Sequence, residues 1–221
     1  MSWEKTASPM PSPRPSFQYA TLAQQSETAQ LGMWVFLATE VLFFGGIMLG
    51  YLVFRSHFPA AFEKAASESV IGIGIVNTVV LQTSTLTMVF AILCTERGIA
   101  RWATRLLLVT AALGIGFLCL KGFEYYLDYR DHTVPTLGFH VEGARRGPAM
   151  LFWLFYFYAT GLHALHLTIG VIAVLVMAFR SGRGDFGPGY YSPLEVTGLY
   201  WSFVDIVWAF LFALIYPIGR S

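Results

Sequence analysis

Five long apolar runs, separated by short polar segments, dominate the pattern along the chain. A bilayer core is about 30 Å thick and a helix rises about 1.5 Å per residue, so one span needs roughly 20 predominantly apolar residues. All five runs are long enough. The pattern therefore predicts five transmembrane spans, over residues 31–54, 70–94, 102–126, 149–179 and 193–218.

The runs lack the alternation of apolar and polar residues that is typical of strands in a membrane barrel. Irregular backbone cannot face lipid, because its polar groups would have no hydrogen-bond partners there. We therefore predict an all-α fold, a polytopic membrane helix bundle with five transmembrane helices in one domain over residues 31–221. The polar segments between the runs, including residues 55–69, are interpreted as turns and connections.

Residues 1–30 are rich in Pro, Ser and Gln and have neither a basic start nor an apolar core, so they do not have the pattern of a signal peptide. We expect a flexible aqueous arm there. Lys and Arg do not decide the orientation, since the loops on the N-terminal side hold seven of them and the opposite loops also hold seven, Lys121 included.

Composition supports a membrane protein, with 56% hydrophobic residues, 12% charged residues and a mean hydropathy of +0.59. The net charge of +1 leaves no basic stripe for a phosphate backbone, so no nucleic-acid partner is expected. Cys94 and Cys119 have no CxxC or Cys/His spacing around them. Neither a disulfide nor a zinc site is therefore expected.

Several polar side chains lie inside the apolar runs, where an ionisable group costs several kcal/mol unless it is paired, neutralised or hydrated. Their positions within the runs place them at similar membrane depth. We therefore predict a buried polar cluster formed by Glu40, Gln82, His163, His166 and Asp205.

Each member of this cluster also has a simpler structural interpretation. Glu40 could be a protonated carboxyl satisfied by a neighbouring helix, and Asp205 could be a packing anchor. His163 and His166 share one helical face, and neutral hydrogen-bonded imidazoles are favoured over metal ligands. Polar residues such as Asn77 and Gln82 commonly join helices in membranes.

Metal chemistry on this chain would require more histidines inside the spans. A haem in a helix bundle is usually held by histidines on two facing helices, and a haem-copper centre needs still more. The chain has five histidines, and three of them, His57, His132 and His140, lie between the spans. We expect no catalytic residue, metal or cofactor on this chain.

Five ordered motifs resemble subunit III of the haem-copper oxidases, of the cytochrome c oxidase type. They are "GMWVFLATEVLFFGG", "VNTVVLQTSTLTM", "KGFEYY", "YATGLHALHLTIG" and "YYSPLEVTGLYWSFVDIVWAFLFALIYPIG", and they extend over residues 32–219. The resemblance implies an accessory membrane subunit without haem or copper, docked beside catalytic subunit I together with subunit II. These partners would carry the haem and copper.

The same resemblance implies a bacterial inner-membrane protein with its N-terminus in the cytoplasm. Larger members have seven helices, the first two forming one arm of a lipid-holding cleft, and this chain looks like the shorter five-helix form. By motif, Glu40, Glu124, His163, His166 and Asp205 match residues of the family pattern. Asn77 and Trp201 lie within matching motifs, and Ser202 replaces a histidine of the family pattern.

Arginines at the span ends are candidates for holding phospholipid, because a guanidinium forks onto a phosphate in a geometry that lysine does not reproduce. They are Arg55, Arg105 and Arg180. The simpler interpretation is that these side chains extend to the headgroup region, as any terminal arginine would. The resemblance favours retained phospholipid, and the missing arm argues against a closed cleft.

The expected function is support of proton uptake, lipid retention and stability in a terminal oxidase during electron transfer to oxygen. Two alternatives stay open. The chain could be the related accessory subunit of a quinol oxidase or a nitric-oxide reductase. It could also be a small proton transporter in which Glu40, His163 and Asp205 relay the ion.

Overall fold

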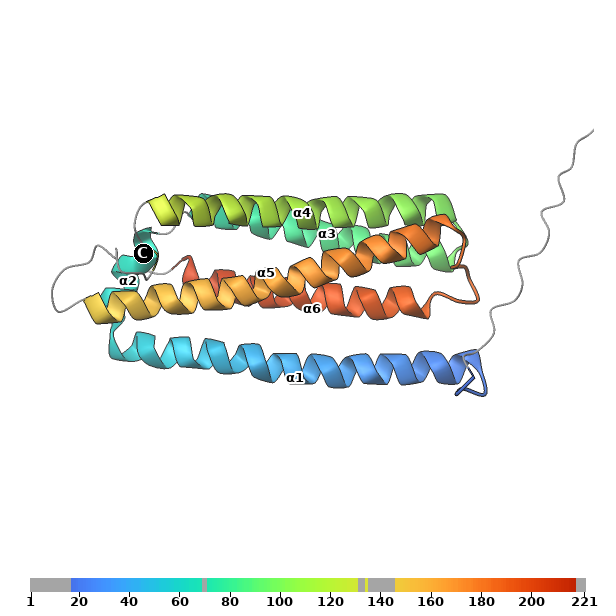
Figure 1. The fold of residues 1–221 in the computed structure, drawn as a ribbon, viewed down its shortest axis with the longest axis horizontal. Coiled ribbons are helices and arrows are strands. Elements are labelled where there is room, and N and C mark those ends of the chain that lie inside the picture. The colour runs from blue at the N-terminus through green and yellow to red at the C-terminus, as the bar shows by residue number, and fades with distance from the viewer. Residues whose placement is uncertain (1–16, 69–70, 131–133, 135–145, 218–221) are drawn as a thin grey trace, which may run out of the picture.

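The computed structural model describes residues 17–68, 71–130, 134 and 146–217. These residues form six helices and no β-strand (Figure 1). In chain order the helices are α1 (Leu22–His57), α2 (Pro59–Glu68), α3 (Ile71–Glu96), α4 (Ala100–Arg130), α5 (Arg146–Gly182) and α6 (Ser192–Ile215). All of them except α2 are long and apolar enough to cross a membrane, which confirms the predicted all-α bundle with five transmembrane helices.

Helix α1 begins at Leu22, well before the expected start of the first span at residue 31. The side chain of Thr21 accepts a hydrogen bond from the backbone N–H of Gln24 and so caps the first turn. Residues 22–30, expected to belong to a flexible arm, are therefore helical. Residues 1–16 of that arm lie outside the described residues.

Residues 55–69 were interpreted above as a turn and connection, and this was wrong for residues 59–68, which form helix α2. Proline is favoured in the first turn of a helix, and alanine is the strongest helix former, so "PAAFEKAASE" folds locally. Its apolar side chains Phe62, Ala65 and Ala66 are fully or almost fully buried. Phe62 packs against Tyr51 of α1 and Phe152 of α5, with ring centroids 5.4 and 5.7 Å apart, respectively.

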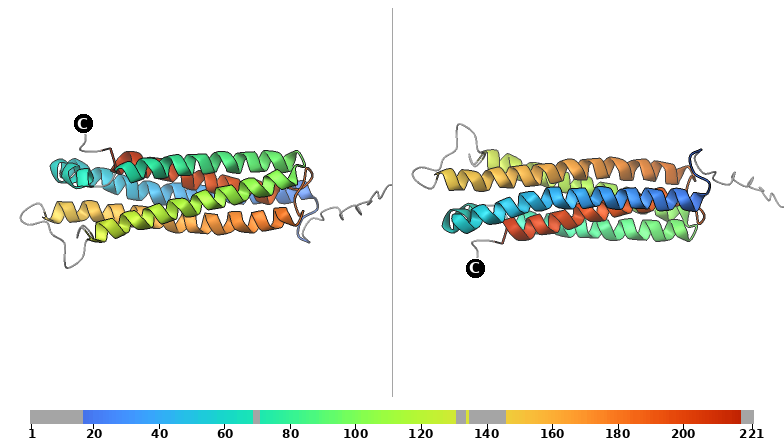
Figure 2. Two further views of the ribbon diagram at one scale, coloured as in Figure 1. Left: turned by 90° about the horizontal axis from the view of Figure 1, so that it is seen from above. Right: turned by 90° about the horizontal axis from the view of Figure 1, so that it is seen from below.

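Helix α6 is the central element of the bundle. It packs against α1, α3 and α5, while α4 packs against α3 and α5. In the most apolar 18-residue stretch of α6, 56% is buried inside the protein. The corresponding share in α1 is only 17%. Helix α1 thus lies at the outside of the bundle, against α5 and α6, as Figures 1 and 2 show from three directions.

The core is organised in layers that recur every seven or eight residues, as in helices that pack at a shallow crossing angle. Three of them are defined by large rings, two on α6 and one on the residue that follows it, and we name them the Trp201, Trp208 and Tyr216 layers. In the Trp201 layer, Gly114 of α4 and Gly170 of α5 make room for the indole. A Cβ atom built on Gly114 would lie 2.7 Å from the Trp201 ring.

Candidate functional site

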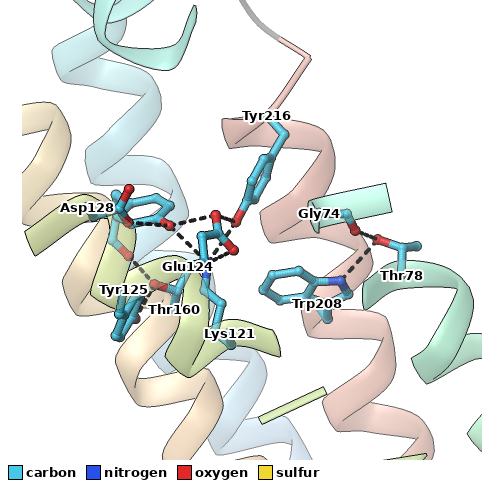
Figure 3. A network of polar contacts seen from close by, with 10 residues as sticks. Gly74, Thr78, Lys121, Glu124, Tyr125, Asp128, Thr160, Trp208 and Tyr216 are labelled. Atoms are coloured by element: carbon cyan, nitrogen blue, oxygen red, sulfur yellow. Dashed lines mark hydrogen bonds and ion pairs between the residues drawn. The ribbon is translucent and has the colours of Figure 1, made fainter. Parts of the chain in front are cut away.

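Lys121 of α4 lies in the Tyr216 layer and is the centre of a buried polar network (Figure 3). Its side-chain ammonium group donates to Glu124 Oε2 at 3.0 Å, to Tyr156 Oη at 3.0 Å and to Tyr216 Oη at 2.7 Å. Lys121 is 2% exposed and Glu124 is fully buried. This ion pair is therefore shielded from both water and lipid.

The two tyrosine hydroxyls complete the partners of the Glu124 carboxylate. Tyr156 and Tyr216 donate to Glu124 Oε1 at 2.8 and 2.6 Å, so both carboxylate oxygens accept hydrogen bonds. The Tyr156 hydroxyl also lies 3.1 Å from Asp128 Oδ2. The network thereby joins α4, α5 and α6 at the end of the bundle where α4 and α6 finish.

Lys121 was counted above among the loop charges, and this was wrong, because its ammonium group is buried inside the bundle and paired with Glu124. The available signal was the spacing of Lys121, Glu124 and Asp128, which places all three on one face of a single helix. A lysine inside a span requires an anionic partner, and the glutamate three residues on is within reach. Without Lys121, the positive charges number seven on the N-terminal side and six on the opposite side.

Glu40 of α1 and His166 of α5 form a second polar site, with Glu40 Oε2 3.1 Å from His166 Nε2. His166 Nδ1 lies 2.8 Å from the carbonyl oxygen of Leu162, which only accepts, so Nδ1 carries a hydrogen. The contact between Nε2 and Oε2 then needs one further proton, on either the imidazole or the carboxyl group. The pair holds that proton between two side chains that are 15% and 17% exposed.

Asp205 of α6 is bound to α3 in a third site. Gln82 donates from Nε2 to Asp205 Oδ1 at 3.3 Å, and Thr85 donates from Oγ1 to Asp205 Oδ2 at 2.7 Å. Asp205 is 3% exposed, while Gln82 is exposed on the outer face of α3. These contacts fix α3 against α6.

His163 belongs to neither pair. Its ring is 1% exposed in the Trp208 layer, between the rings of Phe117 and Trp208, whose centroids lie 5.5 and 5.2 Å away, respectively. Neither ring nitrogen has a hydrogen-bond partner among the described residues. His163 therefore faces α4 and α6, whereas His166 faces α1.

The expected single cluster is thus divided into two separate sites and one isolated imidazole. A step of three residues turns a helix by about 300°, so two side chains three apart diverge by roughly 60°. Helix α5 lies between α1, α4 and α6, and this divergence is enough to send His163 and His166 into different contacts.

The motif residues Trp201, Asn77 and Ser202 have different surroundings. Trp201 is fully buried, and its Nε1–H donates to Ser84 Oγ at 3.1 Å. Asn77 is fully buried, and neither polar atom of its amide group has a partner among the described residues. Ser202 lines a groove of about 380 Å³ between α1, α3 and α6, whose polar end is formed by Gln30 and Glu195.

The three candidate arginines lie at helix ends, as expected from the sequence. Arg180 Nε donates to Asp185 Oδ2 at 3.2 Å, so this guanidinium is engaged within the chain. Arg105 lies over the Trp102 ring, 5.5 Å from its centroid. Arg55 is partly exposed in the last turn of α1. Lipid binding by any of them stays a prediction.

In chemical terms, the described sites can hold a proton, fix helices and present polar atoms to a neighbour. Within the described part of the chain, no group of three or more His, Cys, Asp or Glu side chains is placed to hold a metal ion. His132 and His140 lie outside that part.

Comparisons with known proteins identify the family. The sequence profile of cytochrome c oxidase subunit III matches residues 16–220. The chain is 31% identical over 195 residues to cytochrome c oxidase subunit 3 of Thermostichus vulcanus, covering 86% of this chain and 87% of that protein. It is 30% identical to cytochrome c oxidase subunit 3 of Corynebacterium diphtheriae, with 84% and 86% covered, respectively. A probable cytochrome c oxidase subunit 3 of Rickettsia bellii is also 30% identical, with 86% and 69% covered. The chain therefore belongs to the cytochrome c oxidase subunit III family.

Proposed function

We propose that this subunit has no redox centre of its own and supports the haem- and copper-bearing catalytic subunit I, with subunit II, in an aerobic bacterial terminal oxidase. Membership of the subunit III family implies an oxidase complex with catalytic partner subunits. The proposal adds three roles for this chain, which are support of proton uptake, retention of phospholipid and protection of the catalytic subunit during turnover.

The Glu40–His166 pair is the observation that carries the proposal. It holds one proton on the partly exposed side of α1 and α5, in the middle of two helices long enough to cross the membrane. Lipid tails offer no hydrogen bonds to such a pair, so a neighbouring protein surface or ordered water is its favourable surrounding. A charged or proton-sharing pair beside a proton entrance changes the local potential and water content, on which proton uptake depends.

The arrangement of the polar residues argues against a proton transporter. A relay through Glu40, His163 and Asp205 would need these groups to be joined by hydrogen bonds or water. In the described residues, Glu40 bonds to α5, Asp205 bonds to α3, and His163 is enclosed by aromatic rings. The chain's own geometry therefore favours the accessory role.

Deletion of this chain from the oxidase tests the proposal. We expect the remaining complex to keep its haem and copper spectrum and part of its initial oxygen-consumption rate, and to lose activity progressively faster during turnover. The measurement is oxygen uptake over successive turnovers with absorption spectra before and after. An enzyme that lacks the haem-copper spectrum from the start would show an assembly role instead.

A further inference from the structure

Helix α4 begins and α5 ends at the end of the bundle opposite the Lys121 network (Figure 1). A shallow pocket lies between these two helix ends. It has a volume of about 290 Å³. None of the polar sites described above contributes to it. We name it the α4–α5 pocket, and it is lined by Ala100, Arg101, Thr104, Arg105, Ser181 and Gly182.

The charge of the pocket comes from two arginines. Arg101 and Arg105 are four residues apart on α4, so their side chains project from one face of the helix. Neither forms an ion pair with a carboxylate of the described residues, in contrast to Arg180, which is engaged by Asp185. The pocket lining contains no Asp or Glu. It therefore carries two uncompensated guanidinium groups.

Two hydroxyl groups also line the pocket, one on α4 and one in the last turn of α5. Thr104 Oγ1 and Ser181 Oγ are 2.9 Å apart, and Thr104 Oγ1 also lies 3.1 Å from the carbonyl oxygen of Ala100. Ser181 is 4% exposed, so its hydroxyl is held in place by the packing around it. Thr104 donates its only hydroxyl hydrogen to Ala100, so the Ser181 hydroxyl donates to Thr104. The guanidinium groups are therefore the donors that the pocket offers to an oxyanion.

The surroundings of the pocket place it at a membrane boundary. Trp102 and Phe179 are 57% and 61% exposed beside it, and the exposed apolar residue Leu108 follows within the span on α4. Tryptophan at the end of a span is typical of the headgroup region. The Arg105 guanidinium lies over the Trp102 ring, which limits the positions that it can adopt.

We propose that the α4–α5 pocket binds the phosphate group of an anionic phospholipid, with Arg101 and Arg105 as its principal donors. This inference rests on the lipid-retaining role proposed above and narrows it to one site. A net negative headgroup is preferred over a zwitterionic one, because the lining offers no carboxylate to an ammonium group. The apolar surface beside the pocket receives the acyl chains. Free inorganic phosphate shares the same oxyanion chemistry and is distinguished by experiment.

The first test uses the intact oxidase complex and needs no variant. The complex is exchanged extensively into detergent and then titrated with phosphatidylglycerol, phosphatidylethanolamine or inorganic phosphate, and native mass spectrometry counts bound molecules. We expect phosphatidylglycerol to bind and to outcompete phosphatidylethanolamine. Equal binding of both lipids would overturn the proposed preference for an anionic headgroup. Saturation by inorganic phosphate that prevents lipid binding would assign the pocket to a free anion.

The second test locates the binding in the pocket. The double variant Arg101→Gln/Arg105→Gln should weaken phosphatidylglycerol binding by about tenfold or more, since it removes the charge-assisted hydrogen bonds. The double variant Arg101→Lys/Arg105→Lys should lose part of the affinity. It keeps the positive charges, but an ammonium group does not donate the two parallel hydrogen bonds that a guanidinium donates to a phosphate. Arg183→Gln is the matched control, since that guanidinium lies over Phe179, 4.2 Å from the ring centroid, and does not line the pocket.

The outcomes separate this inference from the broader function. If both double variants bind phosphatidylglycerol as the parent complex does, the pocket is not the lipid site. If in addition deletion of the chain still shortens the working life of the oxidase, the accessory role stands without this site. Loss of binding in Arg183→Gln equal to that in the double variant would show a general charge effect and would overturn the assignment to the pocket.

Discussion

Lys121 has an ammonium group that is removed from water and fully engaged by protein partners. It donates to a carboxylate and two phenol oxygens, and its nitrogen lies 4.6 Å from the centroid of the Tyr156 ring. A buried ion pair is favourable only when its remaining hydrogen bonds are satisfied, and here both Glu124 oxygens are also bonded. The four residues Lys121, Glu124, Tyr156 and Tyr216 therefore act as one unit.

Removing one member of this unit should leave an uncompensated charge. We predict that Lys121→Met destabilises the subunit by about 3–5 kcal/mol, because the Glu124 carboxylate then stays buried without its cation. The double variant Lys121→Met/Glu124→Gln should recover much of that loss. Thermal unfolding of the purified complex measures both. Lys64→Met, on the exposed side of α2, is the control, and an equal loss in the single and double Lys121 variants would contradict the coupling.

The Glu40–His166 contact makes a different prediction, since it depends on one proton rather than on a fixed charge. Glu40→Gln preserves a donor toward His166 Nε2 and should have little effect on stability. Glu40→Ala leaves the imidazole nitrogen without a partner and should cost about 1–3 kcal/mol. Thermal unfolding compares the two variants. Equal and severe losses would show that the carboxylate charge itself is required.

At the scale of the element, the hydrophobic pattern predicted the five spans because a bilayer accepts little other than helices of that length. Helix α2 was not predicted, since its ten residues are too short for a span and its buried face is formed mainly by Phe62 and two alanines. The start of α1 at Leu22 depends on the Thr21 cap within a polar sequence.

The polar sites could be predicted residue by residue more readily than as pairs. Glu40, His163, His166 and Asp205 could be identified from their apolar surroundings, because a polar group inside a span is costly unless it has a partner. Their partners are chosen by helix packing between segments up to 126 residues apart, which the local pattern does not encode. Lys121 was missed because one lysine near the end of a span has the same pattern as a loop charge.

Gly114 of α4 lies against side chains of α5 and α6. Its role in packing can be tested by comparison with Gly116 on the same helix. A Cβ atom at Gly114 would lie 2.7 Å from Trp201 and 2.8 Å from Val171, whereas one at Gly116 would meet no atom within 4 Å. We predict that Gly114→Ala destabilises the bundle by about 1–3 kcal/mol through overpacking. Gly116→Ala should be neutral or slightly stabilising, since alanine favours helix. Circular dichroism during heating compares them, and similar melting of both variants would contradict the layered packing.

At the scale of the whole molecule, the burial of Lys121 also bears on orientation. The loop charges are tied at seven on each side when this lysine is counted among them. Because the ammonium is paired inside the bundle, it does not contribute to the positive charge of a loop, and the N-terminal side then has seven Lys and Arg against six. The α4–α5 pocket, with its two unpaired arginines, lies on that same side. From this difference of one charge we predict a cytoplasmic N-terminus.

Reporter fusions test this orientation directly. With five spans, a cytoplasmic N-terminus places the C-terminus outside, so alkaline phosphatase fused after residue 221 should be active and a green fluorescent protein there should be dark. Fusions in the turn after Gly182, on the N-terminal side of the bundle, should give the reverse. Lys121→Met should leave the pattern unchanged, since a neutralised buried lysine does not act as a topological charge. A reversed reporter pattern in the parent chain would contradict the orientation, and a reversal confined to Lys121→Met would show that this lysine is read as a loop charge during insertion.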